Sequence, residues 1–315
     1  MISIIKRRKI WLAASTIMTI IGLVSFITFG LKLGIDFTGG SLMELEFAVP
    51  VPANQQINEA LASIGINNAI IQPLGDKGIT IRAQDIDEAT HQKILETLKQ
   101  KFQPQLQATD QDGNAIAMEA KVLEERRFDS IGPSIGQELK NKTIWGIIIV
   151  SIAIIAYIAW AFRKISKPVA SWKFGTIAVV SLMHDIIITA GIFAVLGKFY
   201  GIEVNAPFIA ALLTIFGYSN NDTIVVFDRI RENLIRHMGE DFETIVEKSI
   251  NEVIVRSINT SFTVLLALFA LLIFGGSTIR DFVLALIVGV IIGTYSSIFL
   301  ASPLLVVWEK IKPNR

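Results

Sequence analysis

Cysteine is absent from the 315-residue chain, and charged residues are scarce in it. Without cysteine the chain forms no disulfide, no thiolate metal site and no cysteine nucleophile. Charged residues make up 18% of the sequence, against about 25% in an ordinary soluble domain, and 52% of the sequence is hydrophobic. The net charge of +1 argues against a nucleic-acid-binding protein held by a basic surface. A wholly soluble protein is therefore not expected.

The charged residues are unevenly distributed along the chain. Residues 32–142 hold 27 of them, 16 acidic and 11 basic, within 111 residues. The other 204 residues hold only 30. Residues 32–142 thus have the composition of a soluble domain, and the remainder has that of a membrane-spanning region.

Six segments contain the roughly 20 mostly apolar residues that a membrane-spanning helix requires. These segments are 11–31, 143–162, 174–197, 205–227, 257–276 and 282–308. The first follows four basic residues, but its apolar run is longer than that of a signal peptide, and no A-x-A-like cleavage site follows it. We therefore expect an uncleaved signal anchor followed by five further spans.

Lysine and arginine alternate between the two sides of these spans. Sixteen of them lie in the N-terminus, in the loops 163–173 and 228–256, and in the C-terminal tail, whereas the two short opposite loops hold only Lys198 and Arg280. The positive-inside rule then places both termini in the cytoplasm. The expected organisation is a cytoplasmic N-terminus and first span (1–31), an external domain (32–142), spans two to six (143–308) and a cytoplasmic tail (309–315).

The external domain is predicted to be α+β. The expected elements, in order, are a strand over 41–49, a helix over 54–64, strands over 68–73 and 78–83, a helix over 87–102 and a strand over 115–124. Asn54 is a candidate cap of the first helix, and Asp85 or Asp87 of the second. This β-α-β-β-α-β order is typical of a ferredoxin-like fold, which hosts many functions. His91 stands alone in the sequence and is expected to face solvent, because a metal site needs several ligands.

The six spans contain only two acidic residues, Asp185 and Asp222, together with His184 and no lysine or arginine. A charge at the bilayer centre costs at least about 2.5–3.5 kcal/mol on insertion scales. Asp222 belongs to a polar run that must face protein or water. The neighbouring polar residues of that run are Ser219, Asn220, Asn221 and Thr223. We interpret Asp222 as a carboxylate that binds and releases protons; the alternative is a static carboxylate, paired for packing.

Polar residues also mark the fifth and third spans. Arg256 opens the fifth, and Asn259, Thr260 and Thr263 follow on its helical face. Arg256 either faces Asp222 and changes partner as the proton moves, or it is an anchor that reaches the headgroups. His184 and Asp185 are adjacent, so their side chains are expected to point in different directions and not to pair. Asp185 either extends a proton path or bonds to a backbone group or to Thr189.

Several motifs follow one another in a fixed order. They are Gly34–Gly40 (GIDFTGG), Gly132–Gly136 (GPSIG), Gly217–Asn233 (GYSNNDTIVVFDRIREN), Arg256–Ser261 (RSINTS), Phe274–Gly276 (FGG) and Gly293–Ser297 (GTYSS). Together they resemble the SecF family of bacterial protein-export membrane proteins, within the resistance–nodulation–division superfamily. The resemblance extends from about residue 30 to residue 303.

This resemblance implies a fold, partners and a mechanism. It implies a six-helix transmembrane bundle, half of a resistance–nodulation–division transporter, with an α+β ferredoxin-like external domain. Pairing with SecD would complete twelve spans in the bacterial inner membrane. The complex would assist the SecYEG channel, with YajC as a further partner, by drawing the exported polypeptide outward with the proton-motive force. The family's functional carboxylate maps onto Asp222 and its functional arginine onto Arg256.

Other functions remain open on the sequence alone. Walker, G-x-S-x-G and H-E-x-x-H motifs do not occur, so we expect a non-enzymatic protein with protons as its coupling ion and no cofactor. One alternative is a small-molecule exporter subunit of the same superfamily, although such exporters usually carry two external domains and about twelve spans in one chain. Another is a structural scaffold of the translocation machinery.

Overall fold

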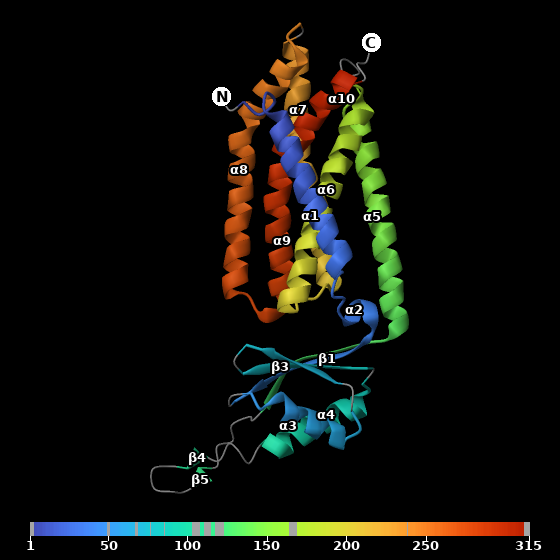
Figure 1. Cartoon of the computed structure of the whole chain (residues 1–315), viewed down its shortest axis with the longest axis vertical. Coiled ribbons are helices and arrows are strands. Elements are labelled where there is room, and N and C mark those ends of the chain that lie inside the picture. Colours follow the sequence, from blue (N-terminus) through green and yellow to red (C-terminus); the bar gives the residue numbers. More distant parts are fainter. Residues whose placement is uncertain are drawn as a thin grey trace. The chain divides into compact units, whose positions relative to one another are not determined.

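The computed structural model describes residues 3–48, 51–66, 69–75, 77–84, 86–102, 108–109, 115–116, 123–163, 169–237 and 239–311. The chain divides into two compact units, and each is described by itself (Figure 1). One unit consists of residues 1–32 and 142–315 and is helical, whereas the other consists of residues 33–141 and contains the β-sheet.

Long helices build the helical unit. They are α1 (Arg8–Phe29), α5 (Pro133–Ala161, whose first residues belong to the other unit), α6 (Ser171–Tyr200), α7 (Ala206–Arg236), α8 (Phe242–Phe274), α9 (Ser277–Ser296) and α10 (Ser302–Ile311). A π-helical turn, η2 (Ser297–Ala301), joins α9 to α10 without a break. Five of the six apolar segments expected from the sequence lie largely within one helix each, and the last, 282–308, extends over α9, η2 and α10.

Five helical segments in the described part of the chain are long and apolar enough to cross a membrane. They are Arg8–Phe29, Ser134–Ala161, Ser171–Tyr200, Phe242–Phe274 and Ile279–Ile311. The remaining expected span lies in α7, which is not among the five because its sequence is less apolar. At 31 residues, α7 is about 46 Å long and could cross a bilayer by length. A sixth span therefore stays a prediction.

The helices α6, α7 and α9 contact one another, and α1 and α8 pack against this group (Figure 1). The crossing of α7 and α9 is close because α9 presents glycine at the contact. A Cβ atom on Gly293 would lie 2.8 Å from Cβ of Ser219, and one on Gly289 would overlap the Ile215 side chain. Small residues allow this approach between helices in a membrane, where packing rather than the hydrophobic effect drives association.

The two ends of the helical unit meet on the same side of the bundle. The main-chain N–H groups of Ile4 and Ile5 donate to the Glu247 carboxylate of α8 over 2.6 and 2.7 Å. Arg8 of α1 and Lys310 of α10 both form ion pairs with Glu243. The start of α1, the start of α8 and the end of α10 are thus tied together.

The sheet-containing unit has two helices on one face of a four-stranded antiparallel sheet (Figure 1). Its strands are β1 (Gly40–Phe47), β2 (Ile70–Leu74), β3 (Gly78–Ala83) and β6 (Leu123–Ile131), in the order β2-β3-β1-β6. The helices are α3 (Asn54–Ser63) and α4 (Glu88–Phe102), and a four-residue helix, α2 (Ile35–Thr38), precedes β1. The strands β4 (Ala108–Thr109) and β5 (Ala115–Ile116) form a separate pair.

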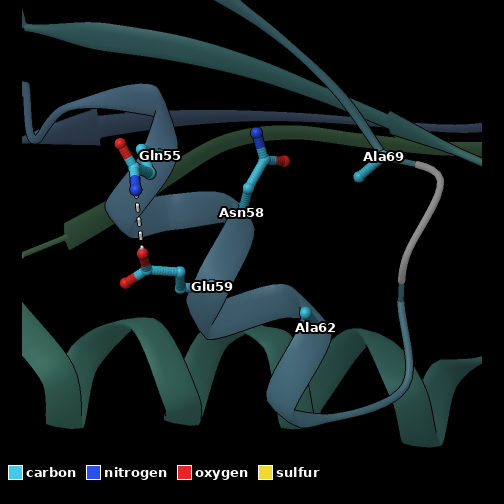
Figure 2. Close-up of a pocket in the computed structure, with 5 residues that line it drawn as sticks. All are labelled: Gln55, Asn58, Glu59, Ala62 and Ala69. Carbon is cyan, nitrogen blue, oxygen red and sulfur yellow. Dashed lines mark hydrogen bonds between the residues drawn. The ribbon is translucent and has the colours of Figure 1, made fainter.

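Alternation along β1 places Met43, Leu45 and Phe47 in the core between sheet and helices, where Ile57 of α3 and Ile94 of α4 also lie. A shallow, open groove beside α3 is lined by polar and small side chains, and there Gln55 donates to Glu59 (Figure 2). The helix and strand types predicted for this unit are confirmed.

Three details of the prediction are wrong or fall outside the described residues. The last strand runs over Leu123–Ile131 and not over 115–124, because Ala115 and Ile116 pair with β4 instead. Asn54 is the first residue of α3, and Ala53 occupies the N-cap position without a side-chain bond. Asp87 caps α4 by accepting from the Thr90 N–H over 2.9 Å, whereas Asp85 lies outside the described residues.

The first testable prediction concerns the close contact of α7 and α9. Gly293→Ala should destabilise the helical unit by about 1–3 kcal/mol, because the added methyl group requires α9 or Ser219 to move. The matched control is Gly146→Ala in α5, where a Cβ atom meets nothing within 4 Å. That change should be neutral or stabilising by up to about 1 kcal/mol. Thermal unfolding in detergent measures both, and equal effects would contradict the prediction.

Candidate functional site

Two aspartates are buried in the helical unit. Asp185 of α6 is 0% exposed, and Asp222 of α7 is 5% exposed. A buried carboxylate is costly unless hydrogen-bond donors or a cation compensate it. The partners of these two groups therefore define the candidate site.

Asp185 connects three helices through its carboxylate. Its Oδ2 accepts from the Ser219 hydroxyl of α7 over 2.6 Å and from the Ser296 hydroxyl of α9 over 2.8 Å. Its Oδ1 lies 2.9 Å from Nδ1 of His184 on α6 itself. Asp185 thus holds α6, α7 and α9 together by side-chain contacts.

The prediction that His184 and Asp185 do not pair is wrong. Adjacent residues leave a helix about 100° apart, but Nδ1 lies close to the ring's point of attachment, so the ring turns back to the short Asp185 side chain. The alternative bond to Thr189 is also corrected in detail. The Thr189 hydroxyl donates to the main-chain carbonyl of Asp185 over 2.8 Å, not to its carboxylate.

Asp222 faces a group of hydroxyls contributed by α7, α8 and α9. Ser257 and Ser261 of α8 lie beside its carboxylate. The Tyr218 hydroxyl donates to Ser261 over 3.1 Å, and Ser261 is hydrogen-bonded to Thr294 of α9 over 2.6 Å. Among the residues that the structure describes, Asp222 Oδ2 is a buried oxygen without a hydrogen-bond partner. Donors are thus close to this carboxylate, but one of its oxygens is unsatisfied.

The rest of the predicted polar run lies on the same helix. Ser219 and Thr223 are buried, and the Thr223 hydroxyl donates to the main-chain carbonyl of Ser219 over 3.2 Å. Asn220 is also buried, and its Oδ1 has no hydrogen-bond partner in the described part of the chain. Asn221 is exposed. The polar run therefore contributes three side chains to the interior and one to the surface.

Arg256 does not meet Asp222 in this structure. Its side chain is exposed on α8, and the described residues contain no ion pair between the two. Ser257, the next residue, faces α7 instead, since adjacent residues of a helix point about 100° apart. Asn259, Thr260 and Thr263 are exposed on α8 as well. We call these four residues the α8 polar stripe.

Sequence reasoning missed the hydroxyls of α8 and α9 that complete the site. Ser257, Ser261, Thr294 and Ser296 lie in apolar segments, where serine and threonine usually bond to their own helix and carry no distinct signal. The motifs Arg256–Ser261 and Gly293–Ser297 each contained two of them, but the spacing of a motif does not show which helix it faces. Their role follows only from the packing of α9 against α6, α7 and α8.

His91 in the sheet-containing unit is a further correction. It was expected to face solvent, but it is only 5% exposed. Its Nε2 lies 2.8 Å from Glu125 of β6, its Nδ1 lies 3.2 Å from Glu88 of α4, and its ring stacks on Phe128 at 3.9 Å. The burial was missed because the strand that carries Glu125 and Phe128 was predicted too early in the sequence. Within the described ranges no group of three or more histidine or acidic residues is arranged so that it could hold a metal ion.

Two stretches of the sequence match models of known protein families. Residues 24–51 match the SecD/SecF GG motif, and residues 113–311 match the C-terminal part of the protein export membrane proteins SecD/SecF. The protein translocase subunit SecF of Thermobaculum terrenum is 43% identical over 98% of this chain and 94% of its own length. The chain belongs to the SecD/SecF family. SecF of Anaerolinea thermophila is 37% identical over the same shares of the two chains.

Solved SecDF structures are similar over nearly the whole chain. The crystal structure of SecDF from Thermus thermophilus, described as a translocon-associated membrane protein, is 31% identical with a TM-score of 0.78. The match covers 98% of this chain but only 39% of that one. The SecDF structure in its super-membrane-facing form has a TM-score of 0.65 at 30% identity. With its five apolar helices, this SecD/SecF member is a membrane protein with the fold of the resistance–nodulation–division type.

The second testable prediction concerns the donors to Asp185. Ser219→Ala removes one of three partners of a fully buried carboxylate, and it should lower the free energy of unfolding by about 1–3 kcal/mol. Ser151→Ala is the control, since Ser151 on α5 bonds only to the carbonyl of its own helix at Ile147. Thermal unfolding in detergent measures the difference; equal stability of the two variants would refute the assignment.

A third prediction concerns acid stability at the start of α4. The hydrogen bond with Thr90 lowers the pKa of the Asp87 carboxyl. A carboxyl with a lowered pKa in the folded state stabilises that state above its unfolded pKa, and this contribution is lost as the pH falls through the folded value. Protection of the first α4 amides from hydrogen exchange, corrected for the intrinsic rate, should therefore fall below about pH 4.

Asp87→Asn keeps a capping acceptor but does not titrate in this range. It should remove the part of the acid sensitivity that comes from Asp87, with little change at neutral pH. An unchanged pH profile in this variant would show that Asp87 does not control the acid stability of α4.

Proposed function

We propose that the chain is a SecF-like subunit of a SecDF complex that assists SecYEG-mediated protein translocation across the bacterial plasma membrane. The names of the relatives, protein translocase subunit SecF and SecDF, support a role in protein translocation. The observation that carries a proton-driven mechanism is the buried Asp222 carboxylate with one unsatisfied oxygen. Intramembrane carboxylates are rare and costly, and in transporters they mark proton paths.

The proposed architecture has six spans, which are the five apolar helical segments and α7, and both termini lie in the cytoplasm. The contacts of Arg8 and Lys310 with Glu243 support the placement of both termini on one side. The distribution of lysine and arginine supports the cytoplasmic side. The proposed external domain is ferredoxin-like, which its strand order β2-β3-β1-β6 and its two helices on one face support.

SecD is the proposed partner of the membrane-spanning half. The α8 polar stripe would be costly against lipid, so a partner helix or a water-filled path must cover it. The two halves of such a transporter would place binding groups near the middle of the membrane, at the interface between them. SecYEG, and YajC as a further component, are proposed partners of the complete assembly.

In the proposed mechanism Asp222 binds a proton from the outer side and releases it to the cytoplasm. The neutral acid needs fewer donors than the charged carboxylate, so each proton would change whether the hydroxyls of Ser257 and Ser261, which lie beside Asp222, donate to it. Arg256, which is exposed in this structure, would turn towards Asp222 to balance its charged state, and Asp185 with His184 would extend the polar path towards α6. This change biases a two-state arrangement of the helices, which moves the external domain and the exported polypeptide.

The fourth testable prediction is that Asp222→Asn abolishes the part of protein export that depends on the proton-motive force. The asparagine amide does not bind and release a proton, so the coupling should be lost. It is similar in size to the carboxyl group, so the complex should still assemble. Asp228→Asn is the control, because Asp228 lies on the same helix, is exposed and pairs with Arg231. Export into inverted membrane vesicles and co-purification with SecD measure the two properties. Full export by Asp222→Asn would eliminate the mechanism.

A further inference from the structure

The hydroxyl groups of α9 lie between the two buried carboxylates and the π-helical turn η2. We propose that Thr294 and Ser296 are positioning residues that transmit a change of charge at Asp222 and Asp185 to η2, and so move α10. The inference rests on the proposed function in one respect, that Asp222 binds and releases a proton. It assigns a role to the motif Gly293–Ser297.

Thr294 has two acceptors for a single proton. Its Oγ1 lies 2.8 Å from the Val290 carbonyl of its own helix and 2.6 Å from Oγ of Ser261 on α8. A hydroxyl has one proton to donate and can accept bonds through its lone pairs. Thr294 therefore donates either to the backbone of α9 or to Ser261, and in the first case it accepts from Ser261.

The charge of Asp222 decides between these two directions. Ser261 accepts from Tyr218 and has its own proton to give either to Thr294 or to the Asp222 carboxylate beside it. When Asp222 is charged, its unsatisfied oxygen draws the proton of Ser261, so Thr294 turns to Ser261 and leaves the Val290 carbonyl. When Asp222 is neutral, Ser261 donates to Thr294, and Thr294 donates to Val290.

Ser296 faces the same choice one half-turn later. Its Oγ lies 2.8 Å from Oδ2 of Asp185 and 3.1 Å from the Gly293 carbonyl of its own helix. When Asp185 is charged, the Ser296 hydroxyl donates its hydrogen bond to the carboxylate. When Asp185 is neutral, the hydroxyl donates to the Gly293 carbonyl instead. Each of the two α9 hydroxyls thus has two alternative acceptors. One is a carbonyl of the α9 backbone, and the other is Ser261 for Thr294 and the Asp185 carboxylate for Ser296.

The affected carbonyls, those of Val290 and Gly293, lie within the last two turns of α9 before η2, which begins at Ser297. Ser297 donates to the Thr294 carbonyl over 3.0 Å, and Ser302 to the Ser297 carbonyl over 3.4 Å, so hydroxyls satisfy carbonyls throughout this turn. Single π-helical turns are frequent at functional sites, and side-chain bonds to helix carbonyls bend helices. A change of one residue in the hydrogen-bond register would rotate α10 by about 100° relative to α9.

The titratable groups around this network come from four helices. Tyr218 of α7 lies beside Asp222, and His184 of α6 bonds to Asp185. Tyr295 of α9 stacks on His184 at 6.4 Å, and its hydroxyl lies 3.1 Å from Ser15 of α1. Arg256 of α8 precedes Ser257 and is exposed. The variant Asp222→Asn imitates the neutral state of Asp222 at every pH. It therefore separates the contribution of Asp222 to a pH-dependent change from the contributions of these other groups.

The absence of cysteine makes a distance measurement direct, because two engineered cysteines are the only sites of labelling. The two labelling sites are Ile235→Cys at the end of α7 and Ile311→Cys at the end of α10. The isoleucine side chains there are 56% and 71% exposed. Both cysteines are spin-labelled in the full chain, reconstituted with SecD in lipid vesicles, and pulsed electron paramagnetic resonance measures their separation at about pH 5 and about pH 8. The inference predicts a shift between the two distributions, and Asp222→Asn should give the acidic distribution at both pH values.

The variants of α9 decide whether the hydroxyls transmit this shift. Thr294→Val keeps the shape but removes the hydroxyl, so it should abolish the pH-dependent shift in distance, and Ser296→Ala should reduce it. Thr294→Ser should restore the shift, which would exclude a merely structural effect. Thr214→Val is the control, since the Thr214 hydroxyl on α7 makes the same type of bond, to Ala210, but is exposed.

Three results would overturn the inference. They are a wild-type distance that does not change with pH, a shift that persists in Asp222→Asn, and a normal shift in Thr294→Val. These results are separate from a failure of the proposed function. If Asp222→Asn exports protein normally, the proposed function fails, whatever the distances show. If that variant is inactive in export while Thr294→Val shifts normally, only the role of α9 fails.

Discussion

A buried carboxylate needs donors, and this requirement organises the helical unit around Asp185 and Asp222. Each of these side chains lies on a helix whose other interior residues are mostly apolar. Asp185 accepts from hydroxyl groups of two neighbouring helices, and hydroxyl groups of α8 lie beside Asp222. Hydroxyls suit this role, because they are small enough for close helix packing and can change between donating and accepting. The glycine at position 293 is part of the same arrangement, since it brings α9 to within reach of Ser219.

The two carboxylates differ in how completely they are satisfied. Asp185 has three partners, which lie on α6, α7 and α9, and it joins these helices by side-chain contacts. Asp222 keeps one oxygen without a donor among the described residues and lies next to α8, whose polar stripe is exposed. A group with unsatisfied bonding capacity is the better candidate for reversible protonation, and it lies where a partner subunit would complete the site.

The sequence was sufficient for the five long apolar helices and for finding the two buried aspartates. Charge is so costly in a bilayer that Asp185 and Asp222 stand out without any structure. It was not sufficient for their partners. Serine and threonine carry little signal in apolar segments. The argument from helical faces wrongly separated His184 from Asp185, and it left open whether Arg256 faces Asp222 or reaches the headgroups. His91 was misplaced for a related reason, because its burial depends on a strand distant in the sequence.

The central claim is that Asp222 carries the proton that drives this subunit, and proton flux through the reconstituted complex tests it most directly. A pH gradient across vesicles that contain the chain with SecD is followed by a pH-sensitive dye. Wild-type complex should dissipate the gradient, whereas complex with Asp222→Asn should leave it as stable as in empty vesicles. Equal proton flux through the two complexes would contradict the claim.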